Sequence, residues 1–279
     1  MKKKIAFQGE KGAYSHIACN ELFTNAEIRT CATFEETFRC AYNDDTYTIV
    51  IPLENSLAGR VADIHYLLPK YKLQIYGEHF QKVEHNLLVK SDAEFKDIKS
   101  VRSHAQAIGQ CQNIINEHKF KTIISADTAG SAKELAEGSD KTIAAIASEL
   151  SASIYDLKII KKNIEDEEGN ITRFLIMGKK PKQPEYKKEQ KYITSCIFRL
   201  KSEPSALYKS LGGFATNQIN LAKLESFSVK NTFDQVNFYL DLEGHIENRS
   251  VQKAMEELGF HTESLDILGV YEASRYREK

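Results

Sequence analysis

The spacing of apolar residues along the chain changes near residue 178. Before that point, short apolar runs alternate with segments whose apolar residues recur every three or four positions, which predicts alternating strands and helices. Such alternation indicates a parallel sheet covered by helices, here with enough material for two lobes and a cleft between them. The strand from Ile171 comes late, and we expect it to return to the first lobe. Strands are predicted at 5–7, 48–53, 86–89, up to 101, at 122–125, at 142–146 and from 171, and helices at 15–23, 61–68, 105–118, 128–137 and 148–155.

The second part of the chain has a different order of predicted elements, β-α-β-β-α-β, which is ferredoxin-like. In its third strand Val236, Phe238, Leu240 and Leu242 alternate with polar residues, so one face of the sheet is buried. Such a small sheet is expected to pair with another copy. The strands are predicted at 193–200, 221–229, 233–242 and 265–270, and the helices at 205–214 and 251–258.

Composition excludes several classes of protein. The 279 residues carry a formal net charge of -1, whereas a nucleic-acid binder needs a surplus of Lys and Arg. No apolar run approaches the roughly 20 residues that span a bilayer, and the N-terminal run is too short for a signal peptide, so we expect a cytoplasmic protein. The five cysteines form no C-x-x-C pair and the eight histidines no H-E-x-x-H pair, so we predict no disulfide framework and no metal.

Polar segments follow several predicted strands, where open α/β sheets hold their ligands. After the strand at 48–53, Asn55 and Ser56 can bind hydroxyl or carboxylate oxygens and Gly59 lets the backbone come close; the alternative is an ordinary turn with a helix cap. After the first strand, Ser15 is a candidate helix cap beside N–H groups that favour an anion; the alternative is a plain glycine-rich turn.

Three further segments have the same placement. His104 in Ser103–Gln106 is interpreted as a helix cap or a satisfied surface histidine, and Asp127 as a helix cap. Thr172-Arg173-Phe174 opens a late strand. Its hydroxyl beside a fixed cation suits an anionic substrate that must lose an oxygen; taken alone, the tripeptide favours an ordinary strand with one polar residue and an exposed Arg.

Together these segments resemble the prephenate dehydratase family. The resemblance rests on four segments, 12–15, 52–56, 103–106 and 170–174, and on a trailing module that resembles an ACT regulatory domain. It implies a two-lobed, periplasmic-binding-protein-like α/β catalytic domain at 1–178, with lobes at roughly 1–76 plus 165–178 and at 77–164. A linker at 179–191 and a ferredoxin-like ACT domain at 192–279 follow. The implied reaction converts prephenate to phenylpyruvate, water and carbon dioxide without a cofactor.

The resemblance also assigns roles to residues. Thr172 would donate a hydrogen bond or proton to the leaving hydroxyl, and Arg173 and Phe174 are catalytic with it. Strand alternation puts Thr172 and Phe174 on one face and Arg173 on the other, so Arg173 is a candidate brace for the site. The implied substrate-binding residues are Ala13, Ser15, Asn55, Ser56, Gly59, Ser103, His104 and Gln106.

The ACT resemblance implies phenylalanine as an effector and a homodimer or homotetramer. Phe227-Ser228 stands where the family usually has Arg-Pro, which leaves the strength of feedback open. The implied phenylalanine-binding residues are Ser205, Ala206, Leu207, Asn220, Leu221, Glu225 and Ser226.

Ala at position 13 also occurs in family members that prefer arogenate, so an arogenate dehydratase is an alternative. A non-catalytic amino-acid sensor is another.

Overall fold

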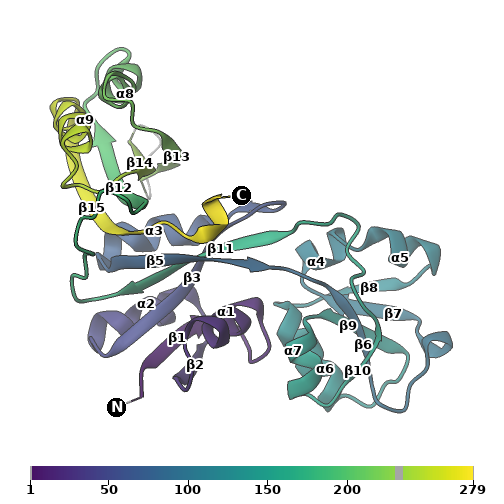
Figure 1. The fold of residues 1–279 in the computed structure, drawn as a ribbon. Helices are drawn as coiled ribbons and strands as arrows, with labels where there is room; N and C mark the ends of the chain where they lie inside the picture. Colours follow the sequence, from purple (N-terminus) through teal and green to yellow (C-terminus); the bar gives the residue numbers. More distant parts are fainter. Residues whose placement is uncertain (1, 230–234, 279) are drawn as a thin grey trace. The chain divides into compact units, whose positions relative to one another are not determined.

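The described part of the chain forms three sheets (Figure 1). The structure is a computed structural model that describes residues 2–229 and 235–278. The contacts divide it into two compact units. The first comprises Met1–Thr37, Val50–Val61 and His79–Phe174, and the second Phe38–Ile49, Ala62–Glu78 and Leu175–Lys279.

The N-terminal sheet has six strands in the order β2-β1-β3-β11-β5, with β4 paired to β3. The prediction that the late strand returns to the first lobe is confirmed, since β11 lies between β3 and β5. Ile5, Ala6 and Phe7 of β1 are fully buried, which explains the unbroken apolar run at the start of the chain. The strands are β1 (Lys4–Gln8), β2 (Glu27–Cys31), β3 (Tyr47–Asn55), β4 (Gly59–Arg60), β5 (Gln74–Lys82) and β11 (Ile171–Gly178), and the helices α1 (Tyr14–Leu22), α2 (Phe34–Asn43) and α3 (Ala62–Tyr71).

The second sheet has five strands in the order β10-β6-β9-β7-β8, and it corrects the prediction of a parallel sheet. β7 is parallel to β8 and β9, but β6 is antiparallel to both β9 and β10. β6 follows β5 after a short connection at 83–85, so no crossover helix constrains its direction. The strands are β6 (Asn86–Val89), β7 (Ser100–Ser103), β8 (Lys121–Ile124), β9 (Ile143–Ala147) and β10 (Lys158–Lys161).

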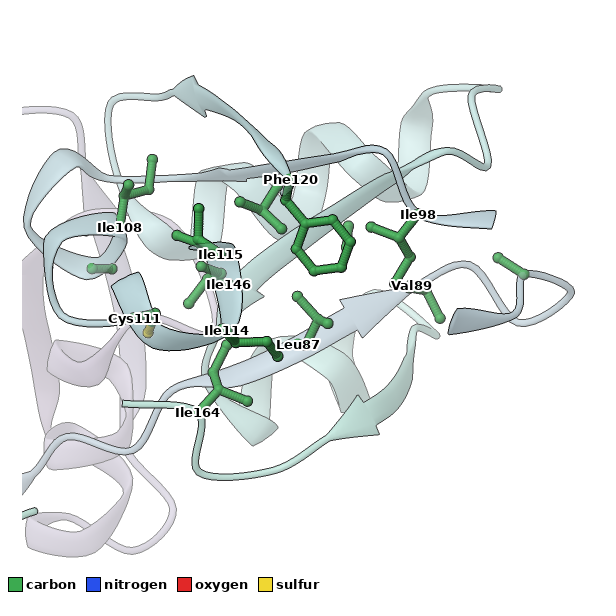
Figure 2. Close-up of a cluster of buried hydrophobic side chains, with 14 residues drawn as sticks. Leu87, Val89, Ile98, Ile108, Cys111, Ile114, Ile115, Phe120, Ile146 and Ile164 are labelled. Atoms are coloured by element: carbon green, nitrogen blue, oxygen red, sulfur yellow. The ribbon is translucent and has the colours of Figure 1, made fainter. Parts of the chain in front are cut away.

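Helices cover both faces of this second sheet (Figure 1). On one face, residues of α4 and α5 pack with Leu87, Val89 and Ile146 around the ring of Phe120 (Figure 2). On the other face, α6 and α7 pack against neighbouring strand positions such as Leu88, as strand alternation requires. These helices are α4 (Ala105–Gly109), α5 (Gln112–Glu117), α6 (Thr128–Glu137) and α7 (Glu149–Ile154), and the 3-10 turn η1 is Phe95–Asp97.

The single helix predicted at 105–118 is wrong, because the chain forms two helices there. The Asp166 carboxylate accepts the N–H groups of Gln112 at 2.7 Å and Asn113 at 2.9 Å, which caps the start of α5. The carbonyl of Gln110 meanwhile accepts the N–H of Asp166 at 2.7 Å. A carboxylate from a distant loop thus satisfies the N–H groups that a continuous helix would have bonded internally.

The C-terminal module is a four-stranded antiparallel sheet in the order β13-β14-β12-β15. Its element order confirms the predicted β-α-β-β-α-β pattern, although residues 233–234 of the predicted third strand lie outside the described residues. The helices α8 and α9 bury one face through Phe214, Val251 and Leu258. The elements are β12 (Tyr192–Leu200), α8 (Ala206–Thr216), β13 (Leu221–Ser228), β14 (Val236–Glu243), α9 (Arg249–Phe260), β15 (Thr262–Glu272) and the 3-10 turn η2 (Arg275–Glu278).

The opposite face of this sheet packs against α3 of the same unit. The His65 ring lies 5.4 Å from the Phe227 ring and 5.7 Å from the Tyr239 ring, measured between centroids. Phe227 is therefore buried, at 4% exposure, at the position where the sequence departs from the usual Arg. Within the described ranges, no helix is long and apolar enough to span a bilayer.

Candidate functional site

The end of β3 and the start of β11 place amide and hydroxyl groups side by side. Asn55 Nδ2 donates to Thr172 Oγ1 at 3.0 Å and to Asn170 Oδ1 at 2.6 Å. The backbone of the next residue, Ser56, joins the same two strands, because its N–H donates to the Ile171 carbonyl at 2.8 Å. Two residues 117 positions apart in the sequence are thereby held as direct neighbours.

The side chain of Asn55 has only one possible orientation. Its Oδ1 accepts the backbone N–H groups of Leu57 at 3.0 Å and Ala58 at 2.8 Å in the turn after β3. A backbone N–H can only donate, so the opposite end of the amide must be the NH₂ group. Both hydrogens of that NH₂ are used, one by Asn170 and one by Thr172.

Thr172 consequently accepts a hydrogen bond from the protein and keeps its own hydrogen. The side chain is half-buried, so a ligand can reach it. A hydroxyl that accepts from Asn55 can direct its hydrogen toward an oxygen of a bound molecule. The site therefore offers a hydrogen-bond donor held in place by its neighbour.

Arg173 and Phe174, the other two residues of the tripeptide, have different surroundings. Arg173 Nη1 lies 3.2 Å from Glu54 Oε1, and its side chain is only 3% exposed. An ion pair of this kind braces β3 against β11, which supports the bracing role considered from the sequence. Phe174 is 1% exposed and packs with Ile5, Phe7 and Val50, so its ring belongs to the hydrophobic core.

A chain of polar side chains extends from Asn170 away from Thr172. Asn170 Nδ2 donates to Gln110 Oε1 at 2.8 Å, and His85 Nε2 lies 2.9 Å from the same oxygen. His85 Nδ1 is 3.0 Å from the Tyr14 hydroxyl, which donates to the Glu84 carbonyl at 2.7 Å. Burial lowers the pKa of His85 and raises that of Tyr14 well above its usual value, so both groups stay neutral near pH 7.

Sequence reasoning assigned no role to Gln110, Asn170, His85 or Tyr14. They lie on four separate segments, and no spacing rule connects them. The available signal was weak: polar Glu84 and His85 directly precede the fully buried strand β6. Asn170 lies within the segment 170–174, but that pattern gives it no role of its own.

Other residues predicted to bind substrate have local structural roles. Ser103 is fully buried and donates to the Ile146 carbonyl at 2.7 Å. His104 caps α4 by accepting the N–H of Gln106 at 3.3 Å, which confirms its interpretation as a cap, and the Gln106 side chain is exposed. Asp127 caps α6 by accepting the N–H of Gly130 at 2.7 Å, also as predicted.

The loop before α1 differs from its prediction. Ala13 is the N-cap of α1 and Ser15 lies inside the first turn, so the predicted Ser15 cap is wrong. The helix begins before Ser15, because the Ala13 carbonyl already accepts the N–H groups of His16 at 2.8 Å and Ile17 at 3.1 Å. The Gly12 carbonyl accepts the hydroxyls of Ser148 at 2.5 Å and Ser151 at 3.1 Å, which holds this loop against α7. Gly59 is exposed in β4, with φ +80°, and no other residue lies within 4 Å of where a Cβ would stand.

The C-terminal module contains a cavity of about 650 Å³ at the start of α8. Ser205, Ala206 and Leu207 line it, as do side chains of both charges and the ring of Phe238. The remaining predicted effector residues lie elsewhere, on or just before β13: Asn220, Leu221, Glu225 and Ser226.

Known proteins resemble the chain over nearly its whole length. The sequence model of the family described as prephenate dehydratase matches residues 5–182. The chain is 40% identical to the bifunctional N-acyl-homoserine lactone acylase/prephenate dehydratase of Komagataeibacter europaeus, over 99% of this chain and 98% of that protein. It is 35% identical to the prephenate dehydratase of Methanocaldococcus jannaschii, over 97% and 98% of the two chains. It is also 35% identical to arogenate dehydratase/prephenate dehydratase 2 of Arabidopsis thaliana, over 96% and 72%.

Two solved structures share the fold. One, described as a novel type of quorum-quenching acylase, is 40% identical with a TM-score of 0.91, covering 98% of this chain and 99% of that one. The other is the prephenate dehydratase of Arthrobacter aurescens in complex with L-Phe, 24% identical with a TM-score of 0.89, covering 99% and 91%.

Proposed function

Because this chain belongs to the prephenate dehydratase family, we propose that the site at Thr172 converts prephenate to phenylpyruvate, water and carbon dioxide in phenylalanine biosynthesis. The observation that carries the assignment is the hydrogen bond from Asn55 to Thr172, which leaves the Thr172 hydrogen for the substrate.

The reaction needs little from the protein beyond orientation and one donor. The electron pair of the bond to the ring carboxylate moves into the ring as carbon dioxide leaves, and the ring becomes aromatic by expelling hydroxide from the opposite carbon. A hydrogen bond from Thr172 stabilises the negative charge that develops on that oxygen. A Thr hydroxyl is a weak acid, so we assign it chiefly electrostatic stabilisation, with water as the final product.

The neighbouring residues have supporting roles in this proposal. Asn55 orients Thr172, and the pair of Arg173 with Glu54 holds the two strands that carry them. Ser56 adds a second link, since its hydroxyl accepts the N–H of Ile171 at 3.0 Å. Gln106 is exposed at the start of α4 and is proposed to contact the substrate rather than the protein.

Substitution of Thr172 tests the function. Thr172→Ala should lower kcat by about a hundredfold to a thousandfold or more while substrate binding persists, because it removes a donor used in the transition state. Thr172→Ser keeps the hydroxyl and is the matched control. Phenylpyruvate formation is followed with the purified protein, and binding by calorimetry. Wild-type turnover by Thr172→Ala would refute the role of Thr172, and binding without turnover by wild type would favour an amino-acid sensor.

Arogenate is the alternative substrate of the same site. Its support is the similarity to a plant protein whose name carries both dehydratase activities, together with Ala13 at the N-cap of α1. A paired assay with prephenate and arogenate decides between them. Turnover of arogenate alone would move the assignment to the amino analogue and give Ala13 a role.

A second activity is favoured by the relative that is 40% identical, whose name includes N-acyl-homoserine lactone acylase. We propose that this chain also be tested for hydrolysis of the amide bond in N-acyl-homoserine lactones, with release of homoserine lactone as the readout. The Thr172→Ala variant shows whether both reactions use one site. If no homoserine lactone is released under conditions of full prephenate turnover, the second activity is excluded.

The assignment of domains along the chain is also part of the proposal. Residues 1–178 form the catalytic domain, with lobes at roughly 1–76 plus 165–178 and at 77–164, residues 179–191 the linker and 192–279 an ACT domain. The ferredoxin-like strand order supports the last assignment. Tyr208 and Phe260, at 83% and 65% exposure, are apolar surface on its helices and support a homodimer or homotetramer.

Phenylalanine is the proposed effector. The cavity at the start of α8 combines side chains of both charges with an aromatic wall, which suits a zwitterion carrying a phenyl ring.

We place the reaction in the cytoplasm, because all five cysteines are buried thiols, as is usual in reducing compartments.

A further inference from the structure

We propose that His85 is a positioning residue for the dehydration. It carries a hydrogen on Nε2 and donates it to Gln110 Oε1, which also accepts from Asn170, so that a hydrogen-bond chain links His85 through Gln110, Asn170 and Asn55 to the Thr172 hydroxyl. This inference rests on the proposed function of Thr172 and adds to it a residue that does not touch the substrate. Figure 1 shows the elements beside which the members of this hydrogen-bond chain lie, from β3 and β11 to α4 and the start of β6.

The direction of the chain is set at the end nearest Thr172. The backbone N–H groups of Leu57 and Ala58 fix Asn55 Oδ1 as an acceptor and Nδ2 as a donor. Asn55 Nδ2 lies 2.6 Å from Asn170, so the atom of Asn170 that faces it must be the carbonyl oxygen. The other end of Asn170 is then its NH₂ group.

The same donor–acceptor argument fixes the orientation of Gln110 and then the tautomer of His85. The NH₂ of Asn170 lies 2.8 Å from Gln110, so Gln110 presents its carbonyl oxygen there. His85 Nε2 is 2.9 Å from this same oxygen, and two lone pairs at that distance would repel each other. Nε2 must therefore carry a hydrogen, and the tautomer of His85 follows from two backbone N–H groups located 27 or more positions earlier in the chain.

Tyr14 completes the far end. Its hydroxyl lies 3.0 Å from His85 Nδ1 and 2.7 Å from the Glu84 carbonyl, and both are acceptors when His85 is neutral. The single hydrogen of Tyr14 is therefore shared between them. This side of the imidazole accepts and the other side donates, so the donors of Tyr14 and His85 meet those of Asn55 and Asn170 at Gln110 Oε1.

The ring of His85 stays neutral because burial outweighs the nearby Glu165 carboxylate, whose charge by itself would raise the pKa of His85. The Glu165 carboxylate accepts the backbone N–H of His85 at 2.9 Å, and Glu84 contributes its carbonyl through Tyr14. The Cys111 thiol, buried near Tyr14, stays protonated because burial raises its pKa. Burial is also the largest influence on His85 and lowers its pKa, so the neutral ring prevails over the imidazolium near pH 7.

Without a donor at His85 Nε2, the hydrogen-bond chain loses the contact that fixes the orientation of the Gln110 amide. The Gln110 amide could then rotate and turn its NH₂ toward the NH₂ of Asn170, and Asn170 cannot reverse in response because Asn55 is fixed. The resulting mismatch would displace Asn170, and with it Thr172, which lies two residues further along the same segment. A displacement of about 1 Å in a catalytic group can lower the rate a hundredfold.

Two substitutions of His85 separate this role from simple packing. His85→Gln places an amide NH₂ close to the position of Nε2, whereas His85→Asn reaches only the position of Nδ1. We expect His85→Gln to keep kcat within about threefold of wild type and His85→Asn to lower it by about tenfold to a hundredfold, with KM changing less than kcat. A packing role alone would lower kcat in both variants or in neither, and that result would overturn the proposal.

A measurement independent of turnover tests the tautomer. In ¹⁵N NMR spectra of the wild-type protein at pH 7.5, the His85 ring should show a protonated Nε2 and an unprotonated Nδ1, assigned by the signal that disappears in His85→Gln. A proton on Nδ1 alone would overturn the proposal even if both His85 variants folded poorly. If wild type failed to turn over prephenate while Nε2 was protonated, the proposed function would fail and the hydrogen-bond chain would stand.

Discussion

At the scale of single residues, Asn55 has two tasks that depend on each other. Its oxygen closes the turn after β3, and its nitrogen donates to both Asn170 and Thr172. Because the turn bonds fix the amide, the donor cannot rotate away from Thr172. An amide is required here, since a carboxylate of the same shape would present an acceptor on both sides.

Exchange of this amide for a carboxylate gives the first prediction at this scale. Asn55→Asp keeps the bonds to Leu57 and Ala58 but turns the Thr172 hydrogen toward the new carboxylate, so kcat should fall by about a hundredfold to a thousandfold. Asn116→Asp, on the exposed surface of α5, adds the same charge elsewhere and is the control. Steady-state kinetics and thermal melting of both variants provide the test; unchanged kcat in Asn55→Asp would contradict the assigned direction of the hydrogen bond.

A second prediction concerns the stability of the protein in mild acid. Burial lowers the folded-state pKa of both His16 and His85, while a histidine in the unfolded chain titrates near 6.5. As the pH falls through about 6.5, the unfolded state binds protons that the folded state does not, so the free energy of unfolding should decrease. Urea unfolding at pH 7.5 and pH 5.5 measures this change, and His85→Gln should show a smaller decrease than wild type. Equal decreases would mean that His85 is not buried as a neutral ring.

The residues of the site were predicted unevenly, for a physical reason. Thr172, Asn55 and Ser56 lie in short motifs at strand ends, where sequence patterns point to ligand sites. His85 and Gln110 are single polar residues whose meaning comes only from contacts with distant segments. A hydrogen-bond chain across several loops has no periodicity, so no reading of spacing could find it.

At the scale of elements, the close approach of β15 to β5 depends on one glycine. A Cβ on Gly269 would clash with the Ile75 carbonyl oxygen, and a backbone atom cannot move aside as a flexible side chain can. Only a residue without a side chain allows these two strands of the second unit to meet. The glycine therefore determines how the four-stranded sheet is attached within its own unit.

A pair of glycine substitutions tests this attachment. Gly269→Ala should lower the free energy of unfolding by about 1–3 kcal/mol or more, because the added methyl group overpacks the contact. Gly259→Ala lies in α9 with open space around it and should raise the stability by up to about 1 kcal/mol, because alanine favours a helix. Chemical denaturation of both variants gives the comparison, and equal stability of the two would contradict the close contact.

Elements with strong local signals were predicted well, and the others were missed. The helix at 128–137 has the predicted bounds, because Asp127 caps its start and Gly138 ends it. β5 was missed since its buried residues recur every third position instead of alternating, which hides the strand period. β2 and β10 were missed because they are short, polar and half-exposed. α2, between β2 and β3, was also missed, although the Thr33 hydroxyl accepts the N–H of Glu36 at 3.1 Å and caps its start.

At the scale of the whole molecule, the proposed effector cavity leads to a prediction about regulation. Phenylalanine at a hundredfold excess over its Kd should stabilise the protein by about 2.7 kcal/mol, a melting shift of several degrees, and should lower the rate of prephenate turnover. Ala206→Phe fills the cavity and should abolish both effects while the variant remains folded by circular dichroism. Melting and activity that do not respond to phenylalanine in wild type would contradict the regulatory assignment, and a full response in Ala206→Phe would place the effector elsewhere.

The position of β11 has a consequence for folding of the nascent chain on the ribosome. All five strands of the second sheet lie between Asn86 and Lys161, so that sheet is complete in the nascent chain before Ile171 has been translated. The N-terminal sheet must wait, because β11 is inserted between β3 and β5. Until then, the apolar edges of β3 and β5 stand open, and such edges are where unfinished chains pair wrongly. A translational pause before codon 171 would therefore endanger this protein more than a pause after codon 178.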